Sequence, residues 1–257
     1  MNVWIREDGR ELRMEALAAL IADADHPHVV LLQEMTHLAL QAMQSTSHTA
    51  FQAYTITSLD GQLSNYKTGL LIRNDLALNN VWLLDLPKIG RKAVAASISL
   101  DPNSPSAPPL LVASVHLSSE YSASPLRAAQ LGAVQSHLYG LSSHPSPHIL
   151  IAGDFNVHHE AEEQRLFSDL DLMDVWPSLH PERPGVTFPA SHLRLDRIAL
   201  ALSPTSSPLS LIPTAMEVVG GDPIPALVSV LGEGEICSIS DHAGMLARFT
   251  VHTPRAS

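Results

Sequence analysis

The sequence predicts an α+β chain in which two packed, mostly antiparallel β-sheets are flanked by helices. Short apolar runs typical of strands outnumber the helical patterns, and most connections between them are short. The same pattern gives weaker support to a doubly wound parallel sheet. No glycine-rich phosphate loop follows any of the predicted strands, which disfavours a nucleotide-binding fold.

Length and composition are those of one large domain. The chain has 257 residues, of which 45% are hydrophobic and only 16% are charged, so it can bury a substantial core. It contains no internal repeat, no heptad pattern and no linker long enough to divide it. We therefore expect residues 1–257 to form a single domain.

The first half of the chain begins with two helices that enclose a buried strand. Apolar residues recur at helical spacing from residue 10 onward, and a continuous apolar run, typical of a strand buried on both faces, follows Pro27. Thr36 provides the N-cap of the second helix. The predicted elements are helices over Arg10–Ala24 and Thr36–Gln44, and strands over Val29–Leu32, Phe51–Thr57, Thr68–Ile72, Val81–Leu86 and Ala93–Leu100.

The second half combines one long helix with further strands. Turn-forming residues fill Asp101–Pro109, so the strands on either side of this loop form a predicted hairpin. The predicted elements are a helix over Ser124–Tyr139, strands over Leu110–His116, His148–Gly153, Leu195–Leu200, Ala215–Val219 and Gly244–Val251, a Ser/Pro loop at Ser203–Ser210, and a surface excursion over Gly221–Ile239.

Charge and cysteine content disfavour several classes of protein. The net charge of −11 counts against a protein that coats nucleic acid, although a metal ion can supply local positive charge at a site. The single cysteine, Cys237, cannot form an internal disulfide, which fits a reducing nuclear or cytoplasmic compartment. No apolar stretch approaches the ~20 residues of a membrane span, and no signal peptide is readable. We expect a monomer that does not engage a membrane.

Polar residues stand at the ends of several predicted strands. Glu34 follows the first apolar run, His116 ends the strand that begins at Leu110, and Asp154 and Asn156 follow a later strand. Taken alone, each is better explained by strand-end capping or by a turn. Together they place carboxylate, amide and imidazole groups at the rim of a sheet core, where sites form.

Two further acidic positions add to this set. Asp196 lies within a strand pattern, so it either faces solvent, pairs with a neighbouring arginine, or orients a histidine. Asp241 and His242 are adjacent, and a bend is needed for both to face one site. Glu34 is a hard oxygen ligand that suits Mg²⁺ or Mn²⁺.

In this order along the chain, these residues resemble the endonuclease/exonuclease/phosphatase superfamily, and most closely the tyrosyl-DNA phosphodiesterase 2 group. The individual motifs are short, but their order over nearly the whole chain is specific. The motifs are Asn2, Leu32-Gln33-Glu34, His116-Leu117, Gly153-Asp154-Phe155-Asn156, Leu195-Asp196-Arg197-Ile198 and Ser240-Asp241-His242. The closer likeness rests on residues 2–8, Gln33-Glu34-Met35-Thr36, Gly90-Arg91 and Asp174-Val175-Trp176.

The resemblance implies a four-layer α/β/β/α sandwich with a role for each matched residue. Glu34 would be the principal ligand of Mg²⁺ or Mn²⁺, and Asn2 and Asp241 would complete the metal shell or its water network. Asp154 would activate the attacking water. Asn156 and His116 would hold phosphate oxygens, and His242, oriented by Asp196, would stabilise developing charge or assist proton transfer.

The chain departs from the family pattern at two places. Family members carry a strand ahead of the residue that corresponds to Asn2, so we expect that strand to be missing and Asn2 to lie at a flexible terminus. After His116-Leu117, the expected Glu-Ser is replaced by Ser118-Ser119-Glu120. Glu120 then either takes the place of the family's glutamate after a local shift, or the contact that this glutamate makes is lost.

The sequence leaves three functions open. The first is a metal-dependent phosphodiesterase that removes tyrosyl-type adducts from DNA 5′ ends. The second is a hydrolase of the same superfamily that acts on abasic-site DNA, an RNA end or a small phosphoester. The acidic charge and the presence of only three lysines count against an extended DNA-binding surface. The third is an inactive remnant of such an enzyme.

Overall fold

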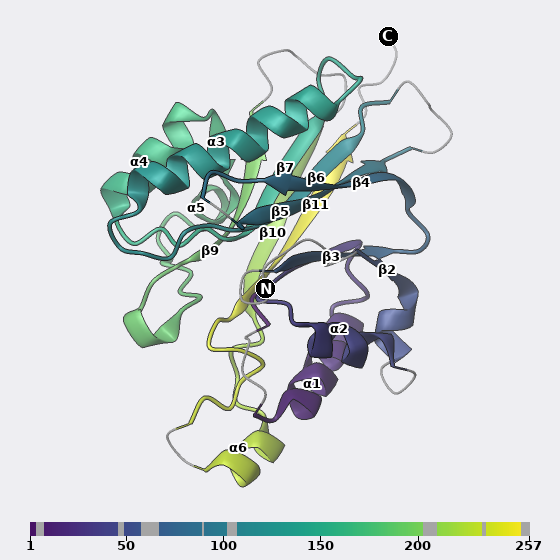
Figure 1. Cartoon of the computed structure of the whole chain (residues 1–257), viewed down its shortest axis with the longest axis vertical. Coiled ribbons are helices and arrows are strands. Elements are labelled where there is room, and N and C mark those ends of the chain that lie inside the picture. Colours follow the sequence, from purple (N-terminus) through teal and green to yellow (C-terminus); the bar gives the residue numbers. More distant parts are fainter. Residues whose placement is uncertain are drawn as a thin grey trace.

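Two layers of β-sheet lie face to face, and helices cover both outer sides (Figure 1). The structure is a computed structural model that describes residues 1–3, 8–45, 49–57, 67–88, 90–101, 107–202, 210–232 and 235–252. The layers run helix, sheet, sheet, helix. This arrangement confirms the predicted four-layer α/β/β/α sandwich.

The larger layer is a six-stranded sheet of order β4-β5-β6-β7-β9-β8. Its strands pair antiparallel except for β6 and β7, which are parallel and are therefore joined by a crossover helix, α3 (Ser124–Leu141). The antiparallel pairing of β5 with β6 confirms the predicted hairpin. The strands are β4 (Ala77–Asp85), β5 (Lys92–Ser99), β6 (Leu110–His116), β7 (His148–Asp154), β8 (Leu172–Asp174) and β9 (Asp196–Ala201).

The second layer consists of two smaller antiparallel sheets. One has the order β1-β3-β2 and the other pairs β10 with β11. At the end of β1, Asn2 forms a parallel bridge with Gln33. The strands are β1 (Val29–Gln33), β2 (Tyr54–Ile56), β3 (Thr68–Arg73), β10 (Ser210–Val219) and β11 (Gly244–His252).

Each outer face is covered by a helix pair. The helices α3 and α4 pack on the six-stranded sheet, and α1 and α2 pack on the sheet that contains β1. Among the described helices, none combines the length and the apolar character that a membrane crossing requires. The remaining helices are α1 (Arg10–Asp23), α2 (His37–Gln44), α4 (Glu160–Asp169), α5 (Val175–Leu179) and α6 (Pro225–Leu231), with 3₁₀ turns η1 (Thr49–Ala53) and η3 (Pro189–Ser191).

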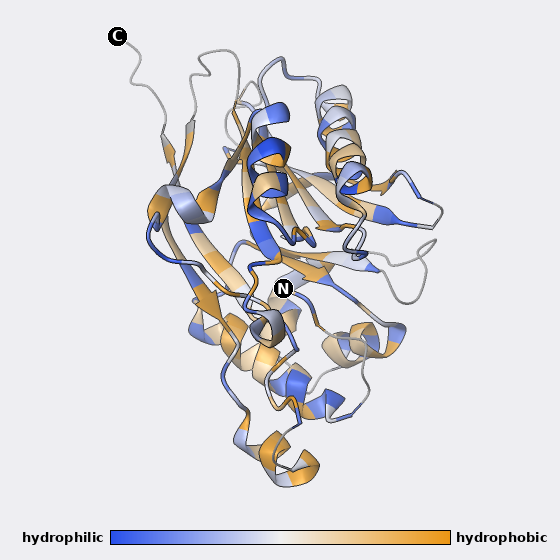
Figure 2. Ribbon diagram, turned by 90° about the vertical axis from the view of Figure 1, so that its left-hand side faces the viewer, coloured by the Kyte–Doolittle hydropathy of each residue, from blue (hydrophilic) through white to orange (hydrophobic). Residues whose placement is uncertain are grey.

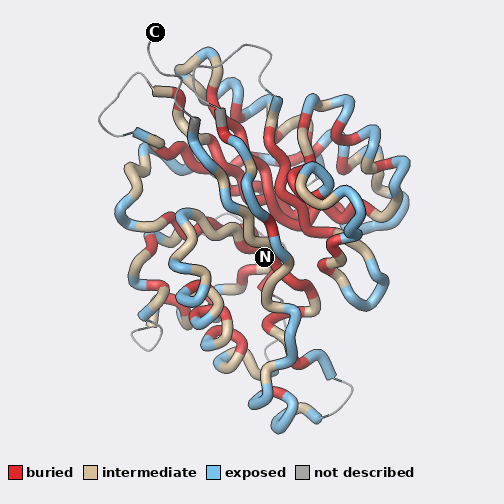
Figure 3. Tube along the Cα trace, turned by 180° about the vertical axis from the view of Figure 1, so that it is seen from behind, coloured by how far each residue is buried: buried red, intermediate tan, exposed pale blue. Residues whose placement is uncertain are grey.

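The central core fills the space between the two sheet layers. Leu70 and Ile72 of β3 meet Val94 and Ala96 of β5, and Leu150 of β7 lies in the same cluster. Hydrophobic residues run along the long strands (Figure 2), and the buried part of the chain is concentrated in these central layers (Figure 3). Two further clusters lie beneath the helix pairs, so the six-stranded sheet and the β1-β3-β2 sheet are packed on both faces.

The predicted elements differ from the observed ones in the shorter segments. Phe51–Thr57 begins with the 3₁₀ turn η1 before β2 starts, and the short elements α4, β8 and α5 were not predicted. The predicted excursion Gly221–Ile239 contains α6, which buries Leu227. Such short elements depend on tertiary contacts, which local sequence patterns do not report. Most of the predicted Ser/Pro loop, residues 203–209, lies outside the described residues.

The strand β1 is less buried than its apolar sequence predicts. Leu32 and Gln33 are fully buried, but Val29, Val30 and Leu31 are only half-buried. A cavity runs along this part of the strand, on the side opposite β3. The expectation of a strand covered on both faces therefore holds only for the end that leads to Glu34.

A chain of hydrogen bonds links the two sheet layers beside Gly153. The Gln33 side chain of β1 donates a hydrogen bond to Ser114 Oγ of β6 (3.0 Å), and Ser114 Oγ donates to the Leu32 carbonyl (3.0 Å). Gly153 has a φ of 138°, and a Cβ there would lie 2.1 Å from the Val115 carbonyl oxygen and 2.9 Å from Gln33 Nε2. Only glycine fits this position.

We expect Gly153→Ala to destabilise the fold by about 2–4 kcal/mol, because the methyl group forces apart the backbone of β6 and the side chain that links the layers. Gly140→Ala is the control. Gly140 lies in α3 with open space around its Cβ position, so this change should be neutral or should stabilise by about 0.5–1 kcal/mol. Urea denaturation measures both, and equal effects of the two changes would contradict the close approach.

Candidate active site

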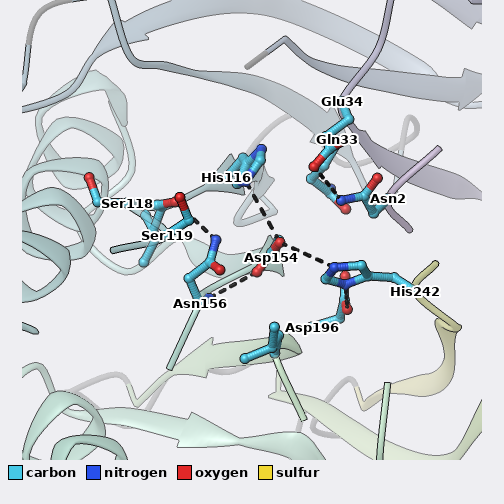
Figure 4. A network of polar contacts seen from close by, with 12 residues as sticks. Asn2, Gln33, Glu34, His116, Ser118, Ser119, Asp154, Asn156, Asp196 and His242 are labelled. Atoms are coloured by element: carbon cyan, nitrogen blue, oxygen red, sulfur yellow. Dashed lines mark hydrogen bonds and ion pairs between the residues drawn. The ribbon is translucent and has the colours of Figure 1, made fainter. Parts of the chain in front are cut away.

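Seven polar residues from six segments of the chain converge where the two sheet layers meet (Figure 4). Each lies at one end of a strand or in a segment directly beside one, so the sheet layers fix their positions. The residues are Asn2, Glu34, His116, Asp154, Asn156, Asp196 and His242.

Asn2 and Glu34 form one side of this cluster. Asn2 is fully buried, and its side-chain amide donates to Glu34 Oε1 at 2.9 Å. Backbone bonds from Gln33 N to the Met1 carbonyl and from Val3 N to the Gln33 carbonyl hold Asn2 beside β1. The expectation that Asn2 lies at a flexible terminus is therefore wrong, because these bonds anchor it.

Glu34 adopts a backbone conformation that favours glycine. Its φ is 56°, in the left-handed region, directly after β1 ends. A non-glycine residue there costs of order 1 kcal/mol or more, and such positions cluster at functional sites. The left-handed turn aims the carboxylate of Glu34 at Asn2 and toward the cluster (Figure 4).

Asp154 and Asn156 form the floor of the site. The Asp154 carboxylate is buried and accepts a hydrogen bond from the Asn156 backbone N–H on Oδ1 (2.9 Å). Asn156 also has a positive φ of 52°. Its side-chain amide donates one hydrogen to the Leu117 carbonyl (3.1 Å). An amide nitrogen carries two hydrogens, so the second can serve a bound phosphate oxygen.

The other oxygen of Asp154 faces two imidazole rings. Asp154 Oδ2 lies 3.7 Å from His116 Nε2 and 4.0 Å from His242 Nε2. Both distances are longer than a direct hydrogen bond, so the three groups surround a position rather than bond to one another. A polar contact across such a distance can be bridged by water.

His242 is oriented by Asp196. Its Nδ1 lies 2.7 Å from Asp196 Oδ2, which leaves Nε2 directed toward Asp154. Asp196 is itself fixed, because its backbone N–H donates to Thr187 Oγ1 (3.0 Å). Of the three arrangements that the sequence left open for Asp196, the structure has the carboxylate paired with a histidine.

The two imidazoles differ in protonation state because their surroundings shift their pKa values in opposite directions. Burial, with the positive charges of Arg91 and His242, lowers the pKa of His116 to about 3. Burial also opposes protonation of His242, but the hydrogen bond and charge of Asp196 raise its pKa to about 9. Burial and the charge of Asp196 raise the pKa of Asp154 to about 7. At neutral pH, His116 is thus neutral and His242 is an imidazolium.

The donor set fits a divalent cation that keeps most of its own water. Glu34 supplies a carboxylate and Asn2 an amide on the same side of the site. In the described ranges, no three His, Cys, Asp or Glu side chains gather into a protein cage for a metal. Mg²⁺ is commonly held by one or two carboxylates with several waters, so the residues present fit it.

Two sequence-predicted contacts are not at the centre of the site. Asp241 accepts a hydrogen bond from Ser240 Oγ (3.1 Å), and it reaches the cluster only through its charge, which favours protonation of His242. Glu120 is exposed and pairs with Lys88 (2.5 Å). It therefore does not take the place of the glutamate that the family carries directly after His-Leu.

Three supporting residues lie next to the site, and of these only Arg91 belonged to a sequence motif, Gly90-Arg91. Arg91 is buried and donates to the carbonyls of His116 and Leu117 at 2.9 and 3.0 Å. Gln130 of α3 accepts from Ser118 N (3.0 Å), and Arg127 donates to the Ser118 carbonyl (3.0 Å). These bonds fix the loop that follows β6. For Arg127 and Gln130, the only signal in the sequence was a polar residue on an otherwise apolar helix stripe.

Comparisons with known proteins agree with this geometry. The sequence profile of the endonuclease/exonuclease/phosphatase family matches residues 2–242. No curated protein sequence matches the chain.

Solved structures share the whole fold. A humanized D. rerio TDP2, a tyrosyl-DNA phosphodiesterase 2, superposes with a TM-score of 0.75 at 22% identity, over 97% of this chain and 96% of that one. D. rerio TDP2 complexed with a single-strand DNA product gives 0.76 at 21% identity, with the same coverage of both chains. The human Nocturnin catalytic domain with a bound sulfate gives 0.69 at 18% identity, over 96% and 88%.

We expect the His242–Asp196 pair to stabilise the folded chain less as the pH rises. The pKa of His242 in the folded chain, about 9, lies above the value of about 6.5 for an unfolded histidine. Its stabilising contribution is therefore complete below pH 6.5 and is lost as the pH rises through 9. His242→Gln should lower the free energy of unfolding. As the pH rises from 6.5 to 9, the difference from the unsubstituted chain should become smaller by on the order of 1–3 kcal/mol.

Urea denaturation in buffer with a chelator, from pH 6 to pH 10, measures this difference. His137→Gln, at an exposed position on α3, is the matched control. A His242→Gln difference that stays constant from pH 6 to pH 10 would contradict the charged pair.

Proposed function

The chain belongs to the endonuclease/exonuclease/phosphatase family, and from that premise we propose that it hydrolyses a phosphodiester by in-line attack of an activated water. Members of this family are hydrolases that act on phosphoester bonds, and they generally use divalent metals. The observation that carries the proposal is the placement of Asp154 Oδ2 between two imidazoles, one neutral and one charged.

Asp154 acts as the general base. A base works best when its pKa lies near the working pH, and the pKa of Asp154 is about 7. Asn156 fixes one carboxylate oxygen, which leaves Oδ2 to accept the proton of a water held between the rings. In-line attack then requires the phosphorus atom to lie on the far side of that water.

His116, Asn156 and His242 bind the phosphate and its developing charge. The neutral His116 donates one N–H, and the Asn156 amide donates its second hydrogen, to non-bridging oxygens. His242 carries a positive charge next to the leaving oxygen, and Asp196 keeps its ring in position. Three donors on rigid strand ends stabilise charge without a large basic surface.

A divalent cation completes the site in this proposal. Glu34, with Asn2 and Asp241 or their waters, would hold Mg²⁺ or Mn²⁺ beside the phosphate. When bound, the cation supplies positive charge that neutralises phosphate oxygens.

The substrate class we propose is a tyrosyl-type adduct on a DNA 5′ end. Two of the similar structures are of TDP2, and one of them holds a single-strand DNA product. The chemistry supports a phenolate leaving group, because its pKa of about 10 demands less protonation than an alkoxide does. The buried site provides a single imidazolium, His242, for that purpose.

A second candidate keeps the reaction and changes the substrate to a small phosphoester, an RNA end or abasic-site DNA. The net charge of −11 and the presence of only three lysines favour a substrate that needs no extended basic surface. The fold is also shared by a B. thetaiotaomicron mannosyl-6-phosphatase, with a TM-score of 0.69 at 16% identity, over 95% of this chain and 92% of that one.

We expect the protein to hydrolyse a chromogenic aryl phosphodiester in the presence of Mg²⁺ or Mn²⁺, and chelation should abolish the activity. Asp154→Asn should lower kcat by about 10²–10⁴-fold because the base is lost. Glu34→Gln should lower it strongly and shift the metal dependence to higher concentration. Absorbance at the nitrophenolate band measures the rate.

The matched controls are Glu217→Gln on β10 and Glu15→Gln on α1, which change exposed carboxylates outside the cluster. Both should retain full activity. Unchanged turnover in Asp154→Asn would reject the base assignment. An absence of activity in the folded wild-type chain with either metal would support the inactive remnant.

We further expect a 5′-tyrosyl oligonucleotide to be cleaved with a higher kcat/KM than an abasic-site duplex or the chromogenic ester. Gel analysis of the released 5′-phosphate end gives the ratio. If the small ester is preferred, or if salt between 50 and 200 mM leaves the oligonucleotide KM unchanged, the DNA substrate is wrong and the second candidate stands.

A further inference from the structure

An exposed aromatic side chain stands on the loop that follows β6, beside the site. Tyr121 is 67% exposed, and among the large apolar and aromatic residues that the structure describes only Val230 of α6 is more exposed. Single exposed side chains of this kind are common on protein surfaces, so the surroundings of Tyr121 decide whether it has a role. Its position next to reactive groups makes those surroundings informative.

Two imidazole rings pack against Tyr121 and join it into one surface. The ring of His159 meets it edge-on with the centroids 4.2 Å apart, and the centroid of His158 lies 5.6 Å away. The Tyr121 hydroxyl lies 3.3 Å from His159 Nδ1. We refer to these three rings as the aromatic platform. They come from the two segments that directly follow β6 and β7.

A buried arginine fixes both of these segments. Arg127 of α3 is fully buried, and its Nη1 donates to the carbonyls of Ser118 (3.0 Å) and Glu120 (2.8 Å), the residue before the tyrosine. Its other two nitrogens donate to the two carboxylate oxygens of Glu162 in α4 (2.6 and 2.8 Å). Bidentate pairs of this kind hold their partners in one geometry. One side chain therefore ties the loop after β6 to the start of α4.

The histidines of the platform are fixed from the same two segments. His159 is the N-cap residue of α4, one turn ahead of the carboxylate that Arg127 holds. His158 Nε2 lies 3.2 Å from the Ser119 carbonyl, which links the two segments directly. The rings are thus in position before a ligand arrives, and binding costs less conformational entropy as a result.

The platform lies on the phosphate side of the site, away from the leaving group. His158 comes two residues after Asn156, so their Cα atoms are at most about 7 Å apart. The Asn156 side chain also donates to the Leu117 carbonyl (3.1 Å), at the start of the loop that carries the tyrosine. Figure 4 shows Asn156 on one side of Asp154 and His242 on the other. Since the leaving oxygen lies next to His242 in the proposed reaction, the platform is beside the group that remains attached to the phosphate.

We propose that the aromatic platform stacks against the base of the first retained nucleotide, whose 5′-phosphate occupies the site. This inference rests on the proposed function and names the part of the DNA end that the protein recognises. Stacking on an aromatic side chain tolerates any base, because every base has a planar face. It also supplies affinity without positive charge, which suits a chain with a net charge of −11.

Two 5′-tyrosyl oligonucleotides test the proposal, one with a complete first nucleotide and one whose first nucleotide lacks its base. With the unsubstituted chain, the complete substrate should have a kcat/KM at least ~5-fold higher. In Tyr121→Ala this ratio should fall to near one, mainly through KM, whereas Tyr121→Phe keeps a ring and should keep most of the ratio. The ratio should be the same at 50 and 200 mM salt, because stacking releases no counterions.

Tyr139→Ala is the matched control, because Tyr139 is also an exposed tyrosine but lies near the end of α3, outside the platform. This change should leave the ratio unaltered. A second measurement does not require cleavage of DNA. Oligonucleotides with a 5′-phosphate, with and without the first base, compete with the chromogenic ester, and the complete one should inhibit at an at least ~5-fold lower concentration. Tyr121→Ala should remove that difference.

Equal kcat/KM for the two tyrosyl oligonucleotides, or an equal loss of both in Tyr121→Ala, would overturn the base contact and leave the proposed function intact. A loss in Tyr121→Ala that disappears when an alkyl group replaces the tyrosyl group would move the contact to the leaving group, which also overturns the proposal. If the chromogenic ester is hydrolysed but neither oligonucleotide is cleaved, the DNA substrate is wrong and the base contact fails with it.

Discussion

The close approach of the two sheet layers at Gly153 is the constraint on which the rest of the structure depends. A glycine with a left-handed φ lets the backbone of β7 pass within contact of Val115, and it leaves room for the Gln33 side chain to reach Ser114. That buried hydrogen bond fixes the position of β1 relative to β6. Because His116 and Asp154 end β6 and β7 and Glu34 directly follows β1, the spacing of the layers sets the spacing of the site.

The site is built from strand ends that turn sharply. Glu34 and Asn156 both adopt positive φ values, and Asn156 caps the Asp154 carboxylate through its own backbone. The backbone strain at these two turns is offset by the packing of the buried strands that precede them, which fixes the backbone in this conformation. The loop after His116 is fixed in the same way by Arg91, Arg127 and Gln130, so few of the reactive groups rely on mobile segments.

The sequence predicted the sandwich and most long strands because buried strands carry continuous apolar runs that are readable locally. It also predicted which side chains would converge, since they follow those runs and recur in a known order. It did not predict α4, β8 or α5, which are short and held by tertiary contacts. The half-buried state of Val29–Leu31 could not be read either, because burial on one edge depends on β11, more than 200 residues away. Asp241 illustrates the limit at the site: its neighbour His242 faces Asp154, but its own carboxylate bonds to Ser240.

The site draws on both extremes of the polypeptide, with Asn2 beside Glu34 and His242 beside Asp196. Gathering segments from both extremes into one cluster is slow, because long loops must close before the cluster can form. A ribosome that makes this protein must therefore release the segment that contains His242 before its ring can reach Asp196. The full set of seven side chains is therefore assembled only when the segment ahead of β11 joins the sheets.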